Sequence, residues 1–257
     1  MSLDTKQTNS GSIIDPTYSN GNYFSDAQRF SSDAQFKAAN FVDLFLRFKT
    51  NYSSIPCNSF VDVGCGSGDV IKLIADALRA NGMNTTRFSA YDVSPHVLNV
   101  KNEGINYHMG DFCQSDENVD IVTAFDVFEH VPDTIGFLKS IAQRCKVVGL
   151  HIPLDNSLNS SMRNRYHAYL QNPGHLINLD LGSALNLLAF SGLRVVDYKY
   201  TFGFLAPSGH SSLPSKILYP LRYLFAKLNP WILSKTLGGA SLMVVALTAN
   251  GLREVNS

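Results

Sequence analysis

Short apolar runs and amphipathic segments alternate along most of the chain. Strands are predicted at 59–64, 87–94, 105–112, within 119–131, and at 146–154, 193–202 and 239–248. Helices are predicted within 25–48 and at 69–82, 95–104, 133–145 and 180–191. Such close alternation is typical of a parallel sheet with crossover helices on both faces. We therefore predict an α/β fold with a doubly wound, mostly parallel, seven-stranded sheet.

The segments outside this alternation suggest how the chain is organised. Residues 1–50 combine a polar start with a helical pattern and are predicted to form an N-terminal helical cap. Residues 51–257 then form the sheet domain. Two of its segments, the polar stretch 155–178 and an irregular insertion at 204–238 before the last strand, are predicted to be substrate lids.

Composition narrows the classes of partner and compartment. The formal net charge is zero, which argues against nucleic acid as a general partner. The four cysteines lack C-x-x-C or zinc-ligand spacing, so we expect reduced thiols and no metal. No secretory signal is apparent, and the longest apolar run, 241–249, is too short to cross a bilayer. We expect a soluble, cytoplasmic protein.

A glycine-rich turn follows the first predicted strand, in SFVDVGCGSGDV at 59–70. Its glycines, Gly64, Gly66 and Gly68, do not follow the dinucleotide-binding pattern G-x-G-x-x-G, because Asp69 stands where the third glycine belongs. A pyrophosphate would tolerate Asp62 and Asp69 poorly, whereas a cationic cofactor would favour both.

Four motifs, each at the carboxyl end of a predicted strand, together resemble those of class I S-adenosylmethionine-dependent methyltransferases over roughly 59–200. They are VDVGCGSGD (61–69), YDVS (91–94), GDF (110–112) and DIVTAFDVFEHVPD (120–133). The last of these, with GHLINL (174–179), resembles the subgroup that includes quinone-biosynthesis methyltransferases. The resemblance implies a Rossmann-like methyltransferase sheet that binds S-adenosylmethionine and releases S-adenosylhomocysteine.

The same resemblance implies the cofactor contacts. Asp92 would bind both ribose hydroxyls, Asp111 would accept from the adenine amino group, and Asp62 would hold the methionine amino group. The full implied set is Asp62, Gly64, Cys65, Gly66, Gly68, Asp92, Val93, Asp111, Phe112, Ala124 and Phe125. Structural alternatives remain open: Asp92 as a helix N-cap, Asp111 as a turn residue, and Phe125 as a core residue.

Methyl transfer is an in-line displacement, to which the enzyme contributes mainly alignment and exclusion of water. A hydroxyl acceptor would also need a base. His130 and His175 are the first catalytic candidates, because their motifs would face the pocket, and His151 comes next. Each of the three is also plausible as a structural histidine.

The acceptor is expected to be a small molecule, with lipid-like and glycan-related compounds among the options. From Tyr198 to Arg253 the chain has six Lys or Arg and no Asp or Glu, and 214–235 interleaves cations with apolar residues. Such a segment can form a lid, a homodimer contact or a peripheral membrane contact. Competing functions are an NAD(P)-dependent oxidoreductase, disfavoured by Asp69 and by the missing Tyr-x-x-x-Lys, and a non-catalytic cofactor-binding protein.

Overall fold

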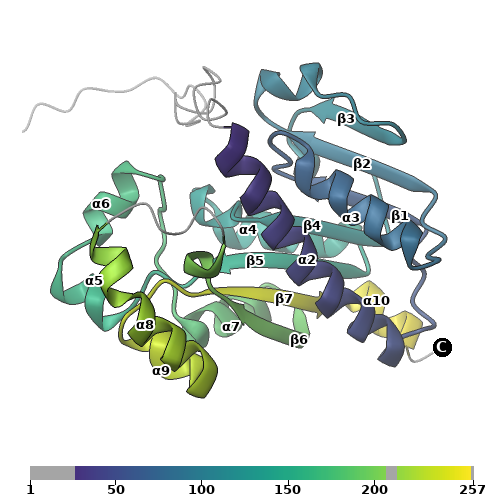
Figure 1. Ribbon diagram of the computed structural model, residues 1–257. Helices are drawn as coiled ribbons and strands as arrows, with labels where there is room; N and C mark the ends of the chain where they lie inside the picture. The colour runs from purple at the N-terminus through teal and green to yellow at the C-terminus, as the bar shows by residue number, and fades with distance from the viewer. Residues whose placement is uncertain (1–26, 207–212, 256–257) are drawn as a thin grey trace, which may run out of the picture.

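The computed structural model describes residues 27–206 and 213–255. Seven strands form one sheet in the order β3-β2-β1-β4-β5-β7-β6 (Figure 1). They are β1 (Ser59–Val63), β2 (Arg87–Asp92), β3 (Ile105–Met109), β4 (Ile121–Phe125), β5 (Val147–Pro153), β6 (Arg194–Thr201) and β7 (Ser241–Leu247). β7 runs antiparallel to both of its neighbours, β5 and β6, and the other strand pairs of this sheet are parallel. The predicted doubly wound, mostly parallel sheet is confirmed.

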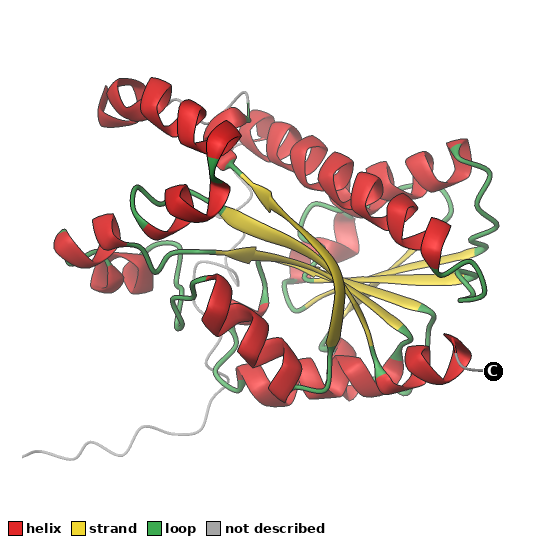
Figure 2. Cartoon of the chain, turned by 90° about the horizontal axis from the view of Figure 1, so that it is seen from below, coloured by secondary structure: helices red, strands yellow, loops and turns green. Residues whose placement is uncertain are grey.

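Helices cover both faces of this sheet, giving three layers (Figure 2). The α-helices are α2 (Ala27–Asn51), α3 (Asp69–Ala80), α4 (Thr134–Arg144), α5 (Leu158–Met162), α6 (Tyr166–Gln171), α7 (Leu181–Phe190), α8 (Leu213–Leu228), α9 (Pro230–Lys235) and α10 (Ala249–Val255). Short 3₁₀ turns are η2 (Pro95–Asn99), η3 (Phe112–Gln114), η4 (Phe128–His130) and η5 (Gly203–Leu205). None of the helices within the described ranges is long and apolar enough to cross a membrane.

The central strands explain why the sequence folds this way. All five residues of β4 are buried, as a parallel strand covered on both faces requires. Successive side chains then enter opposite cores: Phe60 packs with α2 and α3, whereas Val61 packs with α4 and α7. Phe41 of α2 contacts the rings of Phe60 and Phe125, and these contacts attach the N-terminal helix to the sheet.

Several predicted elements differ from the structure. The helix predicted at 95–104 is only the short turn η2, because the chain turns extended at Val100 and β3 starts at Ile105. The strands predicted to end at 64, 94 and 112 end one, two and three residues earlier, at Val63, Asp92 and Met109, because the glycine and cap turns begin there. The insertion predicted as irregular contains α8 and α9, and the polar stretch contains α5 and α6. The polar start of the predicted cap lies outside the described residues.

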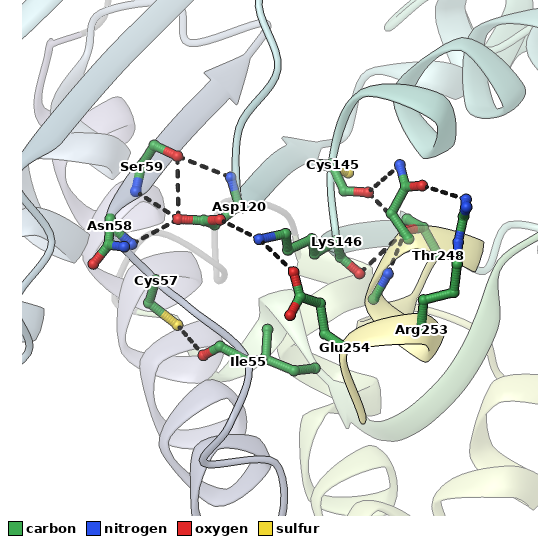
Figure 3. A network of polar contacts seen from close by, with 12 residues as sticks. Ile55, Cys57, Asn58, Ser59, Asp120, Cys145, Lys146, Thr248, Arg253 and Glu254 are labelled. Atoms are coloured by element: carbon green, nitrogen blue, oxygen red, sulfur yellow. Dashed lines mark hydrogen bonds and ion pairs between the residues drawn. The ribbon is translucent and has the colours of Figure 1, made fainter. Parts of the chain in front are cut away.

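A polar network joins the amino ends of three strands (Figure 3). The Asp120 carboxylate accepts hydrogen bonds from the backbone N–H groups of Asn58 and Ser59, at 2.8 and 3.1 Å. It also pairs with Lys146 at 3.2 Å, and Lys146 pairs with Glu254 of α10 at 2.9 Å. These residues hold together the amino ends of the strands. The predicted site lies at the opposite, carboxyl ends.

Candidate active site

The glycine turn lies at the carboxyl end of β1 and is tied to the end of β2. The backbone N–H groups of Gly64 and Cys65 both donate to the carbonyl oxygen of Tyr91, at 2.8 and 3.1 Å. Gly68 then caps the start of α3 with a φ of 76°. The turn therefore sits where ligands bind open α/β sheets, beyond the carboxyl ends of the strands.

Packing within the protein accounts for two of the three glycines. A Cβ on Gly64 would come within 2.5 Å of Val127, and one on Gly68 would come within 2.5 Å of the Tyr107 hydroxyl. All three glycines have positive φ, a conformation that glycine adopts at little cost. Neighbouring side chains and backbone conformation therefore favour glycine at 64 and 68, and close approach of the cofactor to this turn stays a prediction.

Asp92 is the last residue of β2 and lies beside this turn. One carboxylate oxygen accepts from the N–H of Gly66 and the other from the N–H of Ser94, both at 2.8 Å. The N-cap of η2 is Ser94, so the N-cap alternative for Asp92 is wrong. Each carboxylate oxygen has further acceptor capacity, so Asp92 remains able to accept from a diol.

The surface around Asp92 is partly apolar. Val93 and Met109, at the ends of β2 and β3, are 48% and 52% exposed. Asp111 is exposed and its carboxylate accepts from the N–H of Cys113, so it does form the turn contact considered as an alternative. The Phe112 side chain is fully buried beside the Tyr91 ring, which leaves only its backbone for a ligand.

Four further predicted contacts lie deeper. Asp62 is buried and accepts from the Thr123 hydroxyl at 2.7 Å. Burial raises the pKa of Asp62 to about 7, although this hydrogen bond opposes the rise. Cys65 and Phe125 have side chains in the apolar core, and Ala124 is fully buried. Burial also raises the pKa of the Cys65 thiol well above its usual value, so only the backbone of Cys65 suits a cofactor contact.

His151 belongs to a buried network beside this edge. Its Nδ1 lies 2.6 Å from Asp126, and its Nε2 lies 2.8 Å from the Thr201 hydroxyl. Asp126 has a φ of 54° and also pairs with Lys37 of α2 at 2.7 Å. Both ring nitrogens of His151 are therefore engaged, which favours a structural role over that of a base.

His130 and His175 are brought together by folding. His130 and Gly174, the residue that holds it, lie 44 positions apart in the sequence. Their ring centroids lie 4.9 Å apart. His130 Nδ1 lies 3.1 Å from the carbonyl oxygen of Gly174, and His175 Nδ1 lies 2.5 Å from Asp155. Both predicted catalytic histidines thus lie in loops beyond β4 and β5.

Glu129 completes this group, which we call the carboxylate–histidine cluster (Glu129, His130 and His175). It is 1% exposed, and neither of its oxygens has a hydrogen-bond partner. Burial and then the Asp126 carboxylate raise the pKa of Glu129 well above its usual range. The ligand atoms of the three residues lie within 4.8 Å of one another, so the cluster could hold a metal ion.

Sequence reasoning missed Glu129 and Asp155. Glu129 could have been found, because it precedes His130 in the fourth motif. Asp155 carries no local signal: it comes two residues after β5 and reaches His175 only in the folded chain.

The C-terminal insertion lies beyond the ends of β5 and β7 (Figure 1). Its helices expose several large apolar side chains: Leu221, Tyr223, Leu224, Leu228 and Trp231. Part of the cationic charge noted in the sequence is already paired, Lys235 with Asp180 and Lys199 with Asp43. A role for this surface as a lid, a dimer contact or a membrane contact stays a prediction.

Comparison with solved structures supports the fold. Magnesium protoporphyrin IX methyltransferase from Synechocystis PCC 6803, with bound S-adenosylhomocysteine, is 13% identical with a TM-score of 0.53, covering 91% of this chain and 96% of that one. An N-methyltransferase from Bradyrhizobium japonicum WM9 is 12% identical with a TM-score of 0.52, covering 91% and 100%. At such identities the likeness concerns the fold alone.

Proteins matched by sequence are more similar to this chain than these solved structures are. The ubiquinone biosynthesis O-methyltransferases of Hydrogenovibrio crunogenus and Rickettsia prowazekii are each 30% identical, over 49% and 48% of this chain. The matches cover 52% and 48% of those proteins, so the chain spans about half the length of the curated relatives it matches. A model of the methyltransferase domain matches residues 28–198, which include the glycine turn, Asp92 and the whole carboxylate–histidine cluster. The chain belongs to the methyltransferase-domain family.

Proposed function

We propose that this protein is an S-adenosylmethionine-dependent methyltransferase that methylates a hydroxyl group of a small molecule. One observation carries the proposal: a glycine turn bonded to Asp92 and a carboxylate–histidine cluster lie at the same carboxyl edge of the sheet, in a member of the methyltransferase-domain family. The glycine turn with Asp92 is suited to binding the methyl donor, and the cluster is suited to binding the methyl acceptor.

The residues on the donor side fit S-adenosylmethionine. Asp92 offers a two-oxygen acceptor for the ribose diol, and the exposed Val93 and Met109 beside it offer apolar surface for the adenine. Asp62 adds a carboxylate for the methionine ammonium group. These acidic side chains suit a ligand that carries a sulfonium and an ammonium, because opposite charges nearby favour the charged forms.

The acceptor side is suited to an oxygen nucleophile. S-adenosylmethionine would supply the methyl group there: a lone pair of the acceptor oxygen would form the bond to the methyl carbon, the electrons of the carbon–sulfur bond would go to sulfur, and the hydroxyl proton would pass to His130 or His175. His175 is oriented for acceptor activation by its contact with Asp155, and His130 by its contact with Gly174. A positioned group of this kind typically contributes a factor of about 10²–10⁴ in rate.

Other properties support the remaining parts of the proposal. The printed names of the relatives specify O-methyl transfer in ubiquinone biosynthesis, which agrees with a small-molecule acceptor. The four cysteines are free thiols, compatible with the reducing cytoplasm, where we place the protein. The balanced net charge is consistent with a partner other than nucleic acid.

Calorimetry tests this function directly. The purified chain should bind S-adenosylmethionine and S-adenosylhomocysteine at micromolar affinity and should not bind NAD. Binding of NAD without binding of either sulfur compound would contradict the proposal and favour the oxidoreductase alternative.

A further inference from the structure

Glu129, His130 and His175 converge from two loops. Glu129 and His130 belong to η4, which follows β4, and His175 comes from the loop after α6. The Glu129 Oε1 atom lies 4.0 Å from Nε2 of His130 and 4.0 Å from Nε2 of His175. Two imidazoles therefore aim the same ring atom toward one carboxylate.

The partners of the two Nδ1 atoms explain this orientation. The Gly174 carbonyl oxygen can only accept, so Nδ1 of His130 must donate to it. Asp155 likewise accepts from Nδ1 of His175. With the proton on Nδ1, the lone pair of a neutral imidazole is on Nε2, toward Glu129. Metal-ligating histidines are usually held in this way, with the second ring nitrogen donating to a carboxylate or carbonyl.

The Glu129 carboxylate provides a second, independent indication that this cluster binds a ligand. Its side chain is almost completely buried, yet neither carboxylate oxygen has a hydrogen-bond partner. A buried polar group without a partner is costly, and such exceptions in a folded protein call for an explanation such as an ion. A cation bound between Glu129 and the two Nε2 atoms would give the buried carboxylate a partner.

We propose that Glu129, His130 and His175 bind one divalent first-row transition-metal ion, such as Zn²⁺, with Asp155 and the Gly174 carbonyl orienting the histidine ligands. Ligand atoms of a tetrahedral zinc site lie about 3.3 Å apart, as follows from metal–ligand distances near 2.0–2.1 Å. The two 4.0 Å separations between Glu129 and the histidines need to close by about 0.7 Å to reach that spacing, and no two ligand atoms of the cluster lie more than 4.8 Å apart. The sequence-based expectation of no metal is thereby revised.

Three protein ligands leave a coordination position open, as in catalytic rather than structural zinc sites. This further role rests on the proposed methyltransferase function: the open position would take the acceptor hydroxyl. A bound cation lowers the pKa of an oxygen ligand, so the hydroxyl would lose its proton more readily. In that role His130 and His175 act as ligands, and the hydroxyl proton passes to solvent water.

The test is metal binding by the full chain after treatment with a chelator. Zn²⁺ is followed by calorimetry, and Co²⁺ by its visible absorption. We expect one ion per chain, with affinity reduced at least 100-fold in Glu129→Gln and in His175→Gln. Asp155→Asn should reduce affinity about 10- to 100-fold, the usual effect of losing a partner of a histidine ligand.

His167→Gln is the matched control, because His167 is an exposed histidine on α6 outside the cluster. It should bind metal as the wild type does. Far-UV circular dichroism, measured on the same samples, shows that each variant is folded, and binding of S-adenosylhomocysteine is measured alongside. Absence of stoichiometric binding below 100 μM metal, or equal affinity in wild type, Glu129→Gln and His175→Gln, would overturn the proposal.

The two binding measurements fail independently. A chain that binds S-adenosylhomocysteine but no metal retains the proposed function and loses the metal site. A chain that binds metal through the cluster but neither sulfur compound keeps the site and loses the proposed function.

Discussion

Lys37 of α2 lies 2.7 Å from the carboxylate of Asp126, the residue that follows β4. Its second partner, Asp33, is one helical turn away at 2.6 Å. Burial alone would lower the pKa of Lys37, but Asp126 and Asp33 outweigh it and raise that pKa. The pKa of Asp126 is lowered in turn by His151 and Lys37, against the effect of burial. The N-terminal helix is thus joined to the active-site edge by a charged contact.

Lys37→Met should destabilise the chain by about 1–3 kcal/mol, because it leaves Asp126 with one cationic partner fewer in a half-buried position. The free energy of unfolding in urea measures the effect. Lys199→Met is the control, since Lys199 pairs with the exposed Asp43 and such pairs contribute about 0–1 kcal/mol. An equal decrease in the free energy of unfolding of the two variants would show that the Lys37–Asp126 contact contributes no more than the exposed Lys199–Asp43 pair.

Asp92→Ala should weaken binding of S-adenosylhomocysteine about 10- to 150-fold or more. The variant removes the proposed ribose acceptor and also releases the N–H groups of Gly66 and Ser94, and a hydrogen bond to a charged group contributes about 1.5–3 kcal/mol. Titration calorimetry gives the affinity. Asp76→Ala, on the exposed face of α3, should bind as the wild type does; unchanged affinity in both variants would remove Asp92 from the site.

Asp62 should make the stability of the ligand-free protein depend on pH. Its pKa is about 7 in the folded chain and near 4 in the unfolded chain, so between these values the folded state binds more protons. The contribution of Asp62 therefore falls as pH rises from 4 to 7, by at most about 1.4 kcal/mol per pH unit.

Asp62→Asn removes that contribution and keeps an oxygen acceptor for the Thr123 hydroxyl. Urea unfolding at intervals between pH 4.5 and 7.5 should show that the stability of the variant, relative to wild type, increases with pH. Parallel curves for the two proteins would mean that Asp62 is already ionised throughout this range.

Gly68→Ala and Gly82→Ala separate backbone strain from lack of space. Both glycines have positive φ, but a Cβ on Gly82 meets nothing within 4 Å, whereas one on Gly68 meets Tyr107 and Val100. We expect about 1 kcal/mol of destabilisation for Gly82→Ala from strain, and about 2–4 kcal/mol for Gly68→Ala from strain plus overpacking. Thermal or urea unfolding measures both.

A double-mutant cycle checks the cause. Combining Gly68→Ala with Tyr107→Phe removes the hydroxyl nearest the new Cβ and should cost less than the sum of the two single changes. Additive losses would show that the Tyr107 hydroxyl does not limit the space at position 68.

Several features of this protein follow from its sequence alone. The sheet and its edge were predictable because strand and helix periodicities are local, and because chain connectivity places the carboxyl ends of parallel strands together. The glycine turn and Asp92 are likewise local signals, and the structure places both at element ends. Periodicity failed in α8, where Pro220 lies inside the helix, and in η2, where the turn ends after five residues.

The chemistry on the acceptor side depended on tertiary structure. Glu129 and His130 are neighbours in sequence, but Asp155 and His175 reach them only through folding, so no spacing along the chain could reveal the cluster. The partners of Asp126 were hidden for the same reason, since Lys37 and His151 come from a different helix and strand. Sequence determines which side chains are available and at which edge they end. Long-range packing decides which of them meet, because burial and hydrogen-bond partners are properties of the folded chain.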